Sequence, residues 1–201
     1  MLDRPLVFLD LETTGATATS DRITEIGLIE VDDGQFTGEW STLVNPQTRI
    51  PPFIESLTGI SNAMVTDAPT FDEIAVALKE RLDGKLLIAH NARFDYGFLK
   101  NEFARLDMRY SSDLLCTVKL SRKLYPGHSK HNLDTLMERH NVQCEARHRA
   151  LGDARVLWDL LQIWRDEHGD AALAAAAKIG RAPSELQSPM YLVCRLLLEK
   201  K

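Results

Sequence analysis

Three apolar segments in the first 45 residues predict β-strands. Residues 6–9 form a continuous apolar run that leads directly into Asp10, which is typical of a strand buried on both faces. Residues 23–31 form a second β-rich run, and the Asp-Asp-Gly sequence at residues 32–34 is a hairpin signal. Residues 40–44 predict a third strand. Because only short turns separate these segments, we expect an antiparallel meander.

Helices and strands alternate in the remainder of the chain. Residues 71–82 carry apolar side chains at helical spacing, and Thr70 followed by Glu73 has the pattern of a capping box. The other predicted helices are one that begins after an Asn91 cap, residues 133–139 and residues 150–165, and the other predicted strands are residues 86–89 and 114–115. This order predicts a mixed α/β sheet with helices packed against it.

The C-terminal part of the chain has a different composition. Residues 171–177 are rich in alanine, and an Arg-Ala-Pro-Ser sequence at residues 181–184 interrupts them. A length of 201 residues suits one domain with a short appendage. We therefore expect one domain over residues 1–169 and a tail or linker over residues 170–201.

The charge of the chain limits how it can hold nucleic acid. The formal net charge is −5, whereas a protein that grips duplex through a broad basic face is usually positive. A hydrophobic content of 44% is sufficient for a packed core. We therefore expect the chain not to bind tightly along a duplex. It would contact nucleic acid at a strand end, or a partner would help it to bind.

The cysteines and the apolar segments indicate a cytoplasmic protein. Cys116, Cys144 and Cys194 are widely spaced and form no Cys-x-x-Cys pair, which argues against a disulfide framework or a zinc ribbon. The apolar run near the N-terminus is broken by Asp10 and does not have the form of a signal peptide. No apolar stretch approaches the roughly 20 residues that span a bilayer, so we expect no membrane partner.

Two segments place carboxylates at the ends of predicted strands. Asp10 and Glu12 are two residues apart on one strand and therefore point to the same face, where a hard divalent cation would relieve their repulsion. Asp95 lies near the first turn of a helix that follows a short buried strand. The alternatives are a solvated strand end for the first pair, and ordinary capping by Asn91 with a favourable helix dipole at Asp95.

A third segment adds a histidine and another acid at the start of the last predicted helix. His148 and Asp153 are five residues apart, a rotation of about 140° on a helix. The two side chains can therefore meet in one site only if His148 belongs to the loop before the helix. The alternative is a histidine and an acid that both lie on the surface.

Together these segments resemble the histidine variant of the DEDD-type 3′→5′ exonucleases. The matching motifs are Asp-Leu-Glu-Thr-Thr-Gly at residues 10–15, His-Asn-Ala-Arg-Phe-Asp at 90–95 and His-Arg-Ala-Leu-Gly-Asp at 148–153, with secondary motifs at 57–60 and 132–136. The resemblance covers residues 6–167 and is strongest to the proofreading (epsilon-like) subunits of bacterial DNA polymerase III. It implies a ribonuclease H-like fold, which is a mixed five-stranded sheet flanked by helices.

The resemblance also implies a mechanism with two divalent cations, Mg²⁺ in the first place with Mn²⁺ as a substitute. Asp10 would contact both ions, Glu12 and Asp153 would hold the ion that carries the attacking water, and Asp95 would hold the ion nearer the leaving group. His148 would be the general base, a role that suits imidazole because its ordinary pKa is about 6.5.

The family resemblance assigns a pocket for the terminal nucleotide to the segment after the first acids. The candidates are Leu11, Thr13 and Thr14, joined by His90 and Phe94; core packing is the alternative for the Phe94 ring. The candidates for phosphate contacts are Arg93, Lys130, His131, Arg147 and Arg149.

The function that these features imply is release of nucleoside monophosphates from the 3′ end of single-stranded or frayed DNA, in proofreading or repair. Five catalytic positions do not distinguish DNA from RNA, so an RNA-trimming exoribonuclease is an alternative. A nuclease module of a larger polymerase or repair fusion is another. A catalytically inactive binding module is a third, against which the five intact residues argue. A polymerase is a candidate partner, and so is a sliding clamp, because residues 187–192 loosely resemble a glutamine-led clamp-binding peptide.

Overall fold

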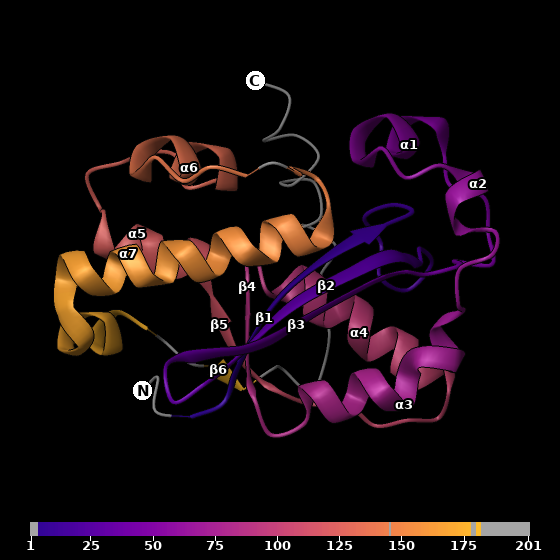
Figure 1. The fold of residues 1–201 in the computed structure, drawn as a ribbon, viewed down its shortest axis with the longest axis horizontal. Coiled ribbons are helices and arrows are strands. Elements are labelled where there is room, and N and C mark those ends of the chain that lie inside the picture. Colours follow the sequence, from indigo (N-terminus) through magenta and orange to yellow (C-terminus); the bar gives the residue numbers. More distant parts are fainter. Residues whose placement is uncertain (1–3, 145, 178–179, 182–201) are drawn as a thin grey trace.

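The fold is built around one twisted sheet with both parallel and antiparallel strands (Figure 1). The structure is a computed structural model that describes residues 4–144, 146–177 and 180–181. The first three strands form the expected antiparallel meander, and their bounds are β1 (Leu6–Thr13), β2 (Ile23–Asp32) and β3 (Gln35–Leu43). Two further strands, β4 (Leu86–Ala89) and β5 (Asp113–Cys116), join on the other side of β1 in parallel. The predicted five-stranded mixed sheet is therefore confirmed.

A sixth strand extends this sheet. The two-residue strand β6 (Gly180–Arg181) pairs antiparallel with β5, which gives the strand order β3-β2-β1-β4-β5-β6. The sequence pattern did not predict β6, because two residues are too few to show a strand periodicity.

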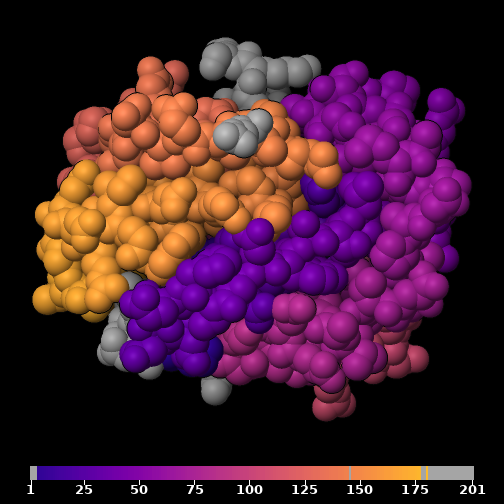
Figure 2. All heavy atoms as spheres, in the orientation of Figure 1, coloured from indigo at the N-terminus to yellow at the C-terminus, as the bar shows by residue number. Residues whose placement is uncertain are grey.

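Helices cover both faces of the sheet (Figure 1). One face packs against α5, α6 and the long α7, and the other packs against α3 and α4. The bounds are α1 (Pro52–Thr58), α2 (Asn62–Val65), α3 (Phe71–Leu82), α4 (Arg93–Arg105), α5 (Thr117–Leu124), α6 (Leu133–His140) and α7 (Ala150–Ala176). In the space-filling view the orange surface of α7 lies along the indigo-to-violet surface of the first strands (Figure 2).

The alternation of side chains along β1 explains why both faces are packed. Leu6 and Phe8 contribute to the core under α7, and Val7, Leu9 and Leu11 contribute to the core under α3 and α4. All five are at most 1% exposed. Since β1 has apolar residues on both faces, it is a central strand, as its continuous apolar run indicated.

Several local predictions hold, and others need correction. Thr70 N–H donates to the Glu73 carboxylate at 2.7 Å, which is the reciprocal bond of the predicted capping box. Asn91 does not cap α4; Ala92 is the residue before the helix, and Asn91 has φ +69°, a left-handed conformation that asparagine tolerates better than most residues. The helices α1, α2 and α5 were not predicted, because each is short and α1 begins at Pro52 directly after a second proline, Pro51.

The last helix is longer than its predicted range. It continues to Ala176 across a break at Gly169, whose φ is +78°. Leu173, beyond the break, is fully buried and belongs to the core between α7 and the sheet. The predicted boundary at residue 169 coincides with this break, and the division into domain and tail stays a prediction. The suggested clamp-binding peptide at residues 187–192 lies outside the described residues.

None of the helices in the described part of the chain is both long enough and apolar enough to cross a bilayer.

Strand β2 and α7 approach each other very closely at Gly27. A Cβ atom added at Gly27 would lie 2.1 Å from the Leu151 backbone nitrogen and 2.2 Å from the Ala150 carbonyl carbon. Real Cβ atoms do not approach backbone atoms so closely, and neither partner is a flexible side chain. The first turn of α7 can occupy its position only because residue 27 has no side chain.

Gly27→Ala should therefore destabilise the fold strongly. We expect the free energy of unfolding, measured in urea, to fall by at least about 3 kcal/mol, the upper part of the range for overpacking. Gly38→Ala on β3 is the matched control, since its Cβ would meet only the end of the Glu30 side chain at 3.9 Å. A Gly27→Ala protein as stable as the Gly38→Ala protein would contradict this account.

Candidate active site

Three of the four predicted acids form one buried group. Asp10 and Glu12 on β1 and Asp153 on α7 each offer a carboxylate oxygen, and these oxygens all lie within 4.8 Å of one another. The residues are 1%, 7% and 0% exposed, respectively. Asp10 and Glu12 point to the α7 face of the sheet, as the i and i+2 spacing on a strand requires.

Strand β2 holds the start of α7 next to these acids. Gly27 is the register partner of Asp10, and Glu25 is the register partner of Glu12. The Glu25 carboxylate accepts a hydrogen bond from the Ala150 backbone N–H at 2.9 Å and from the Arg149 guanidinium at 2.6 to 3.1 Å. The first turn of α7, which carries Asp153, is thereby fixed beside Asp10.

His148 lies in the loop before α7 and not in the helix. The helix begins at Ala150, and His148 has φ +62°, which is a left-handed conformation. The condition under which His148 and Asp153 could share a site is thus met by the backbone. The imidazole is partly exposed and lines the pocket described below.

Asp95 lies on α4, and His90 directly follows β4. Asp95 is fully buried in the first turn of α4, where it lies outside the tight group formed by the other three acids. His90 follows β4, and its Nδ1 atom is 2.9 Å from the Thr117 hydroxyl. The roles assigned to both residues by the family resemblance stay predictions.

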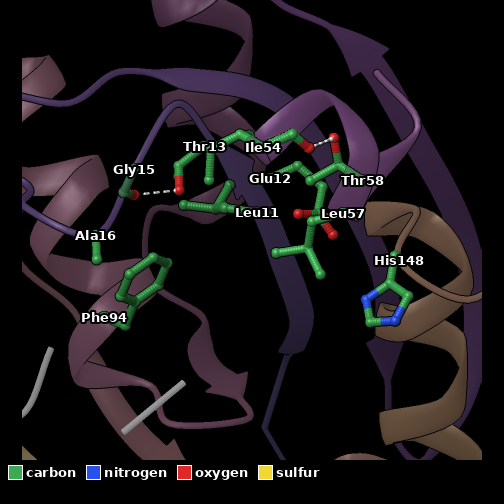
Figure 3. A pocket seen from close by; sticks show the side chains of 10 residues that line it. All are labelled: Leu11, Glu12, Thr13, Gly15, Ala16, Ile54, Leu57, Thr58, Phe94 and His148. Carbon is green, nitrogen blue, oxygen red and sulfur yellow. Dashed lines mark hydrogen bonds between the residues drawn. The ribbon is translucent and has the colours of Figure 1, made fainter. Parts of the chain in front are cut away.

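A pocket opens next to the acids (Figure 3). Phe94 and Ala16 lie on one side of it and His148 on the other, with Glu12 and Leu57 between them. The lining residues are Leu11, Glu12, Thr13, Gly15, Ala16, Ile54, Leu57, Thr58, Phe94 and His148. The pocket is mostly apolar, with one carboxylate and one imidazole that reach it from separate elements.

Three of the five predicted substrate residues line this pocket. These are Leu11, Thr13 and Phe94. The Phe94 ring also packs on the Phe98 ring at a centroid distance of 4.9 Å, so Phe94 both lines the pocket and packs against the core. Thr14 is not among the lining residues, and its hydroxyl accepts the Arg22 backbone N–H at 3.0 Å.

Helix α1 supplies the part of the pocket that sequence reasoning missed. Ile54, Leu57 and Thr58 line it, and the Thr58 hydroxyl donates to the Ile54 carbonyl at 3.0 Å. The secondary motif at residues 57–60 pointed to this segment without assigning it to the site. Pattern alone did not reveal α1, because a seven-residue helix shows too few turns of periodicity.

The loop that follows β1 is held in place by a buried ion pair. Arg22 donates to the Glu102 carboxylate through Nε at 2.7 Å and Nη2 at 3.1 Å, and Glu102 is only 1% exposed. This pair joins the loop to α4, whose first turn carries Phe94 and Asp95. The loop and α4, which form the same side of the pocket (Figure 3), are therefore tied together.

The basic residues near the site have different environments. The Arg147 guanidinium pairs with Asp153 and, through Nε, with Asp134 at 2.7 Å. Burial lowers the pKa of Arg147, but the carboxylates of Asp153 and Asp134 raise it, and the net shift is upward. His131 is buried between Ser121 and the His128 carbonyl, and burial lowers the pKa of its imidazole, so His131 does not suit a phosphate contact.

The acid group fits a hard divalent cation. Carboxylate oxygens are the ligands that Mg²⁺ and Mn²⁺ prefer, and three of them from two elements converge here. Three buried carboxylates whose oxygens lie within 4.8 Å of one another repel each other, and a cation would relieve that repulsion. Asp10, Glu12 and Asp153 are therefore the residues that could hold a metal ion.

Sequence comparisons place the chain among nucleases. The family described as Exonuclease (RNase_T) matches residues 7–161. A PolC-type DNA polymerase III of Caldanaerobacter subterraneus subsp. tengcongensis is 33% identical over 205 residues, which cover all of this chain and 15% of that protein. The 3′-5′ exonuclease DinG of Bacillus subtilis is 39% identical over 152 residues, which cover 75% of this chain and 16% of that protein.

Solved structures agree with this placement. Exonuclease X in complex with 5′ overhanging duplex DNA has a TM-score of 0.67 and 26% identity, over 85% of this chain and 98% of that chain. E. coli exonuclease I in complex with a dT13 oligonucleotide has a TM-score of 0.73 over 81% of this chain and 41% of that chain, and at 16% identity it shows the fold alone. The chain spans less than a fifth of the length of the two curated relatives named above. It belongs to the exonuclease family.

Proposed function

We propose that this exonuclease domain is a metal-dependent 3′→5′ exonuclease that releases nucleoside monophosphates from DNA ends. The observation that carries the proposal is the group of three buried carboxylates beside a pocket that His148 also lines. Hydrolysis of a phosphodiester needs an activated water and stabilisation of charge on the leaving 3′ oxygen. The acids and the imidazole are the groups that such a reaction uses.

The pocket suits one terminal nucleotide. The Phe94 ring offers a face on which a base can stack, and the apolar side chains of Ile54 and Leu57 would exclude water from the space between Phe94 and His148 (Figure 3). His148 would accept a proton from the attacking water at an imidazole nitrogen. Its place in the loop, and not on the helix, lets the ring face the same space as Glu12.

Asp10, Glu12 and Asp153 would hold one divalent cation, with Asp95 assigned to a second by the family resemblance. When bound, these ions would lower the pKa of the attacking water and neutralise charge on the leaving oxygen. Mg²⁺ is the proposed physiological ion, and Mn²⁺ is the proposed substitute. The carboxylates need no proton for this role, since each acts in its ionised form.

DNA is the proposed substrate because the named relatives include a DNA polymerase III and the exonuclease X structure contains DNA. A role in proofreading or repair follows from the same relatives, with a polymerase as the proposed partner. A cytoplasmic location is also proposed, supported by the free thiols of Cys116 and Cys144.

Asp10→Asn should abolish the metal-dependent activity. The substitution removes a charge from the centre of the acid group, so the release of mononucleotides should fall below detection, and chelation of the wild-type protein should have the same effect. Mn²⁺ should raise the melting temperature of the wild type and not of Asp10→Asn, because a bound ligand stabilises the folded state. Asp67→Asn, at an exposed position, is the control and should behave as the wild type. Full activity of the wild type in excess chelator would refute the proposal.

His148→Ala should slow hydrolysis by about 10²- to 10⁴-fold, the usual contribution of a general base. The increase in melting temperature with Mn²⁺ should persist, since His148 is not a proposed metal ligand. His128→Ala removes an exposed histidine outside the pocket and serves as the control. Normal turnover by His148→Ala would remove this residue from the role of base.

The preference for DNA can be measured with a matched set of end-labelled strands. Single-stranded DNA and duplex with a mismatched 3′ terminus should be degraded faster than fully paired duplex, because the pocket takes an unpaired nucleotide. RNA of the same sequence should be degraded more slowly than the single-stranded DNA. Faster degradation of RNA would establish the exoribonuclease alternative instead.

A further inference from the structure

Glu25 is a buried acid whose side chain contacts the start of α7. It is 4% exposed and lies on β2 opposite Glu12. Residues directly opposite in an antiparallel pair point to the same face of the sheet, so Glu25 belongs to the face that carries the acid group. Its carboxylate faces the start of α7.

The carboxylate of Glu25 performs two tasks at that helix start. Its Oε2 atom accepts the Ala150 N–H at 2.9 Å, which is one of the N–H groups that a helix cannot satisfy internally. Both of its oxygens also accept from the Arg149 Nε atom, at 3.0 and 3.1 Å, and Oε1 accepts from Nη2 at 2.6 Å. A bidentate arginine pair fixes direction as well as distance. The hydrogen bond to Glu25 is the main reason why the pKa of Arg149 is raised.

This contact lies directly beside the loop that carries His148. Arg149 is the N-cap of α7 and is bonded in the chain to His148, which has the left-handed φ of +62°. A non-glycine residue in that region is strained and persists only where its surroundings fix it. The Glu25–Arg149 pair and the Ala150 N–H bond fix the two residues that follow His148.

We propose that Glu25 and Arg149 are positioning residues that hold His148 in its left-handed conformation and so set where its imidazole stands relative to Glu12. The proposal rests on the proposed function, in which His148 is the general base. Neither residue touches the reacting atoms in this scheme. Their effect on the rate passes through His148.

The test uses Glu25→Gln and Arg149→Gln, each alone and together with His148→Ala. In the otherwise wild-type protein each substitution should lower kcat by about 10- to 100-fold with little change in KM, because a displacement of about 1 Å at a catalytic group costs a factor of this size. In the His148→Ala background the same substitutions should lower kcat by less than about twofold, since effects that act through one residue do not add. Arg149→Lys, which keeps the charge but loses the fork, should recover only part of the rate.

The matched control is the second acid–arginine contact of β2. Glu30 pairs with Arg81 and Lys85 near the other end of the strand, opposite Val7. Glu30→Gln and Arg81→Gln should leave kcat and KM unchanged in both backgrounds. Melting temperatures of all variants identify any that fail to fold, and Arg149→Gln guards against that outcome because this side chain is 42% exposed.

A second measurement does not depend on activity. The imidazole signals of His148, assigned by their loss in His148→Ala, should shift in the NMR spectra of Glu25→Gln and Arg149→Gln and stay in place in Glu30→Gln. Unchanged His148 signals would overturn the proposal, as would equal losses of kcat in the two backgrounds. If the wild type cleaves no nucleic acid, the proposed function fails, while the NMR comparison still decides whether Glu25 positions His148.

Discussion

The geometry of the site depends on how closely α7 can approach the backbone of β2. The residue opposite Asp10 is Gly27, and a side chain there would meet the first turn of the helix at about 2 Å. The residue opposite Glu12 is Glu25, whose carboxylate binds the first free N–H of the same helix. Strand β2 thus provides both the space for α7, at Gly27, and the hydrogen bond that fixes α7, at Glu25. These two residues are the register partners of Asp10 and Glu12 on β1. Asp153 meets Asp10 and Glu12 because of this register.

The same arrangement concentrates negative charge in the protein interior, and the rest of the structure offsets it. Burial of a carboxylate without a compensating charge is costly. Arg147 pairs with Asp153, and Arg149 pairs with Glu25, so two guanidinium groups lie at the edge of the acid group. The strand beneath the acids is rigid because Leu6, Phe8 and Leu9 are at most 1% exposed. A packed sheet can hold like charges in one place, which a loop could not do without moving them apart.

The sequence predicted the parts of this molecule that leave a periodic or local signal. The apolar run before Asp10 identified the central strand, and the Thr70–Glu73 pattern identified the start of α3. The i and i+2 spacing placed Asp10 and Glu12 on one face. Segments too short for periodicity, such as α1 and β6, gave no such signal. The contacts of Gly27 and Glu25 with α7 join residues more than 120 positions apart, so no local pattern could reveal them. His148 shows the limit most clearly, because its spacing to Asp153 allowed one site only if His148 lay in the loop before the helix. The left-handed backbone that meets this condition leaves no periodic signal in the sequence.

The charge of the chain is consistent with the proposed action at a strand end. With a net charge of −5, the chain has little capacity to gain affinity by releasing counterions from a duplex. Two of the arginines nearest the site are paired with carboxylates, which reduces that capacity further. In the proposed function one base stacks on the Phe94 ring in the pocket, and stacking on one aromatic face contributes only about 1–3 kcal/mol. Weak binding of this kind would suit the proposed exonuclease, which must release each product and accept the next terminus. It would also make a tether to the proposed polymerase partner effective, because a short flexible linkage supplies a local concentration on the order of millimolar without any new contact at the site.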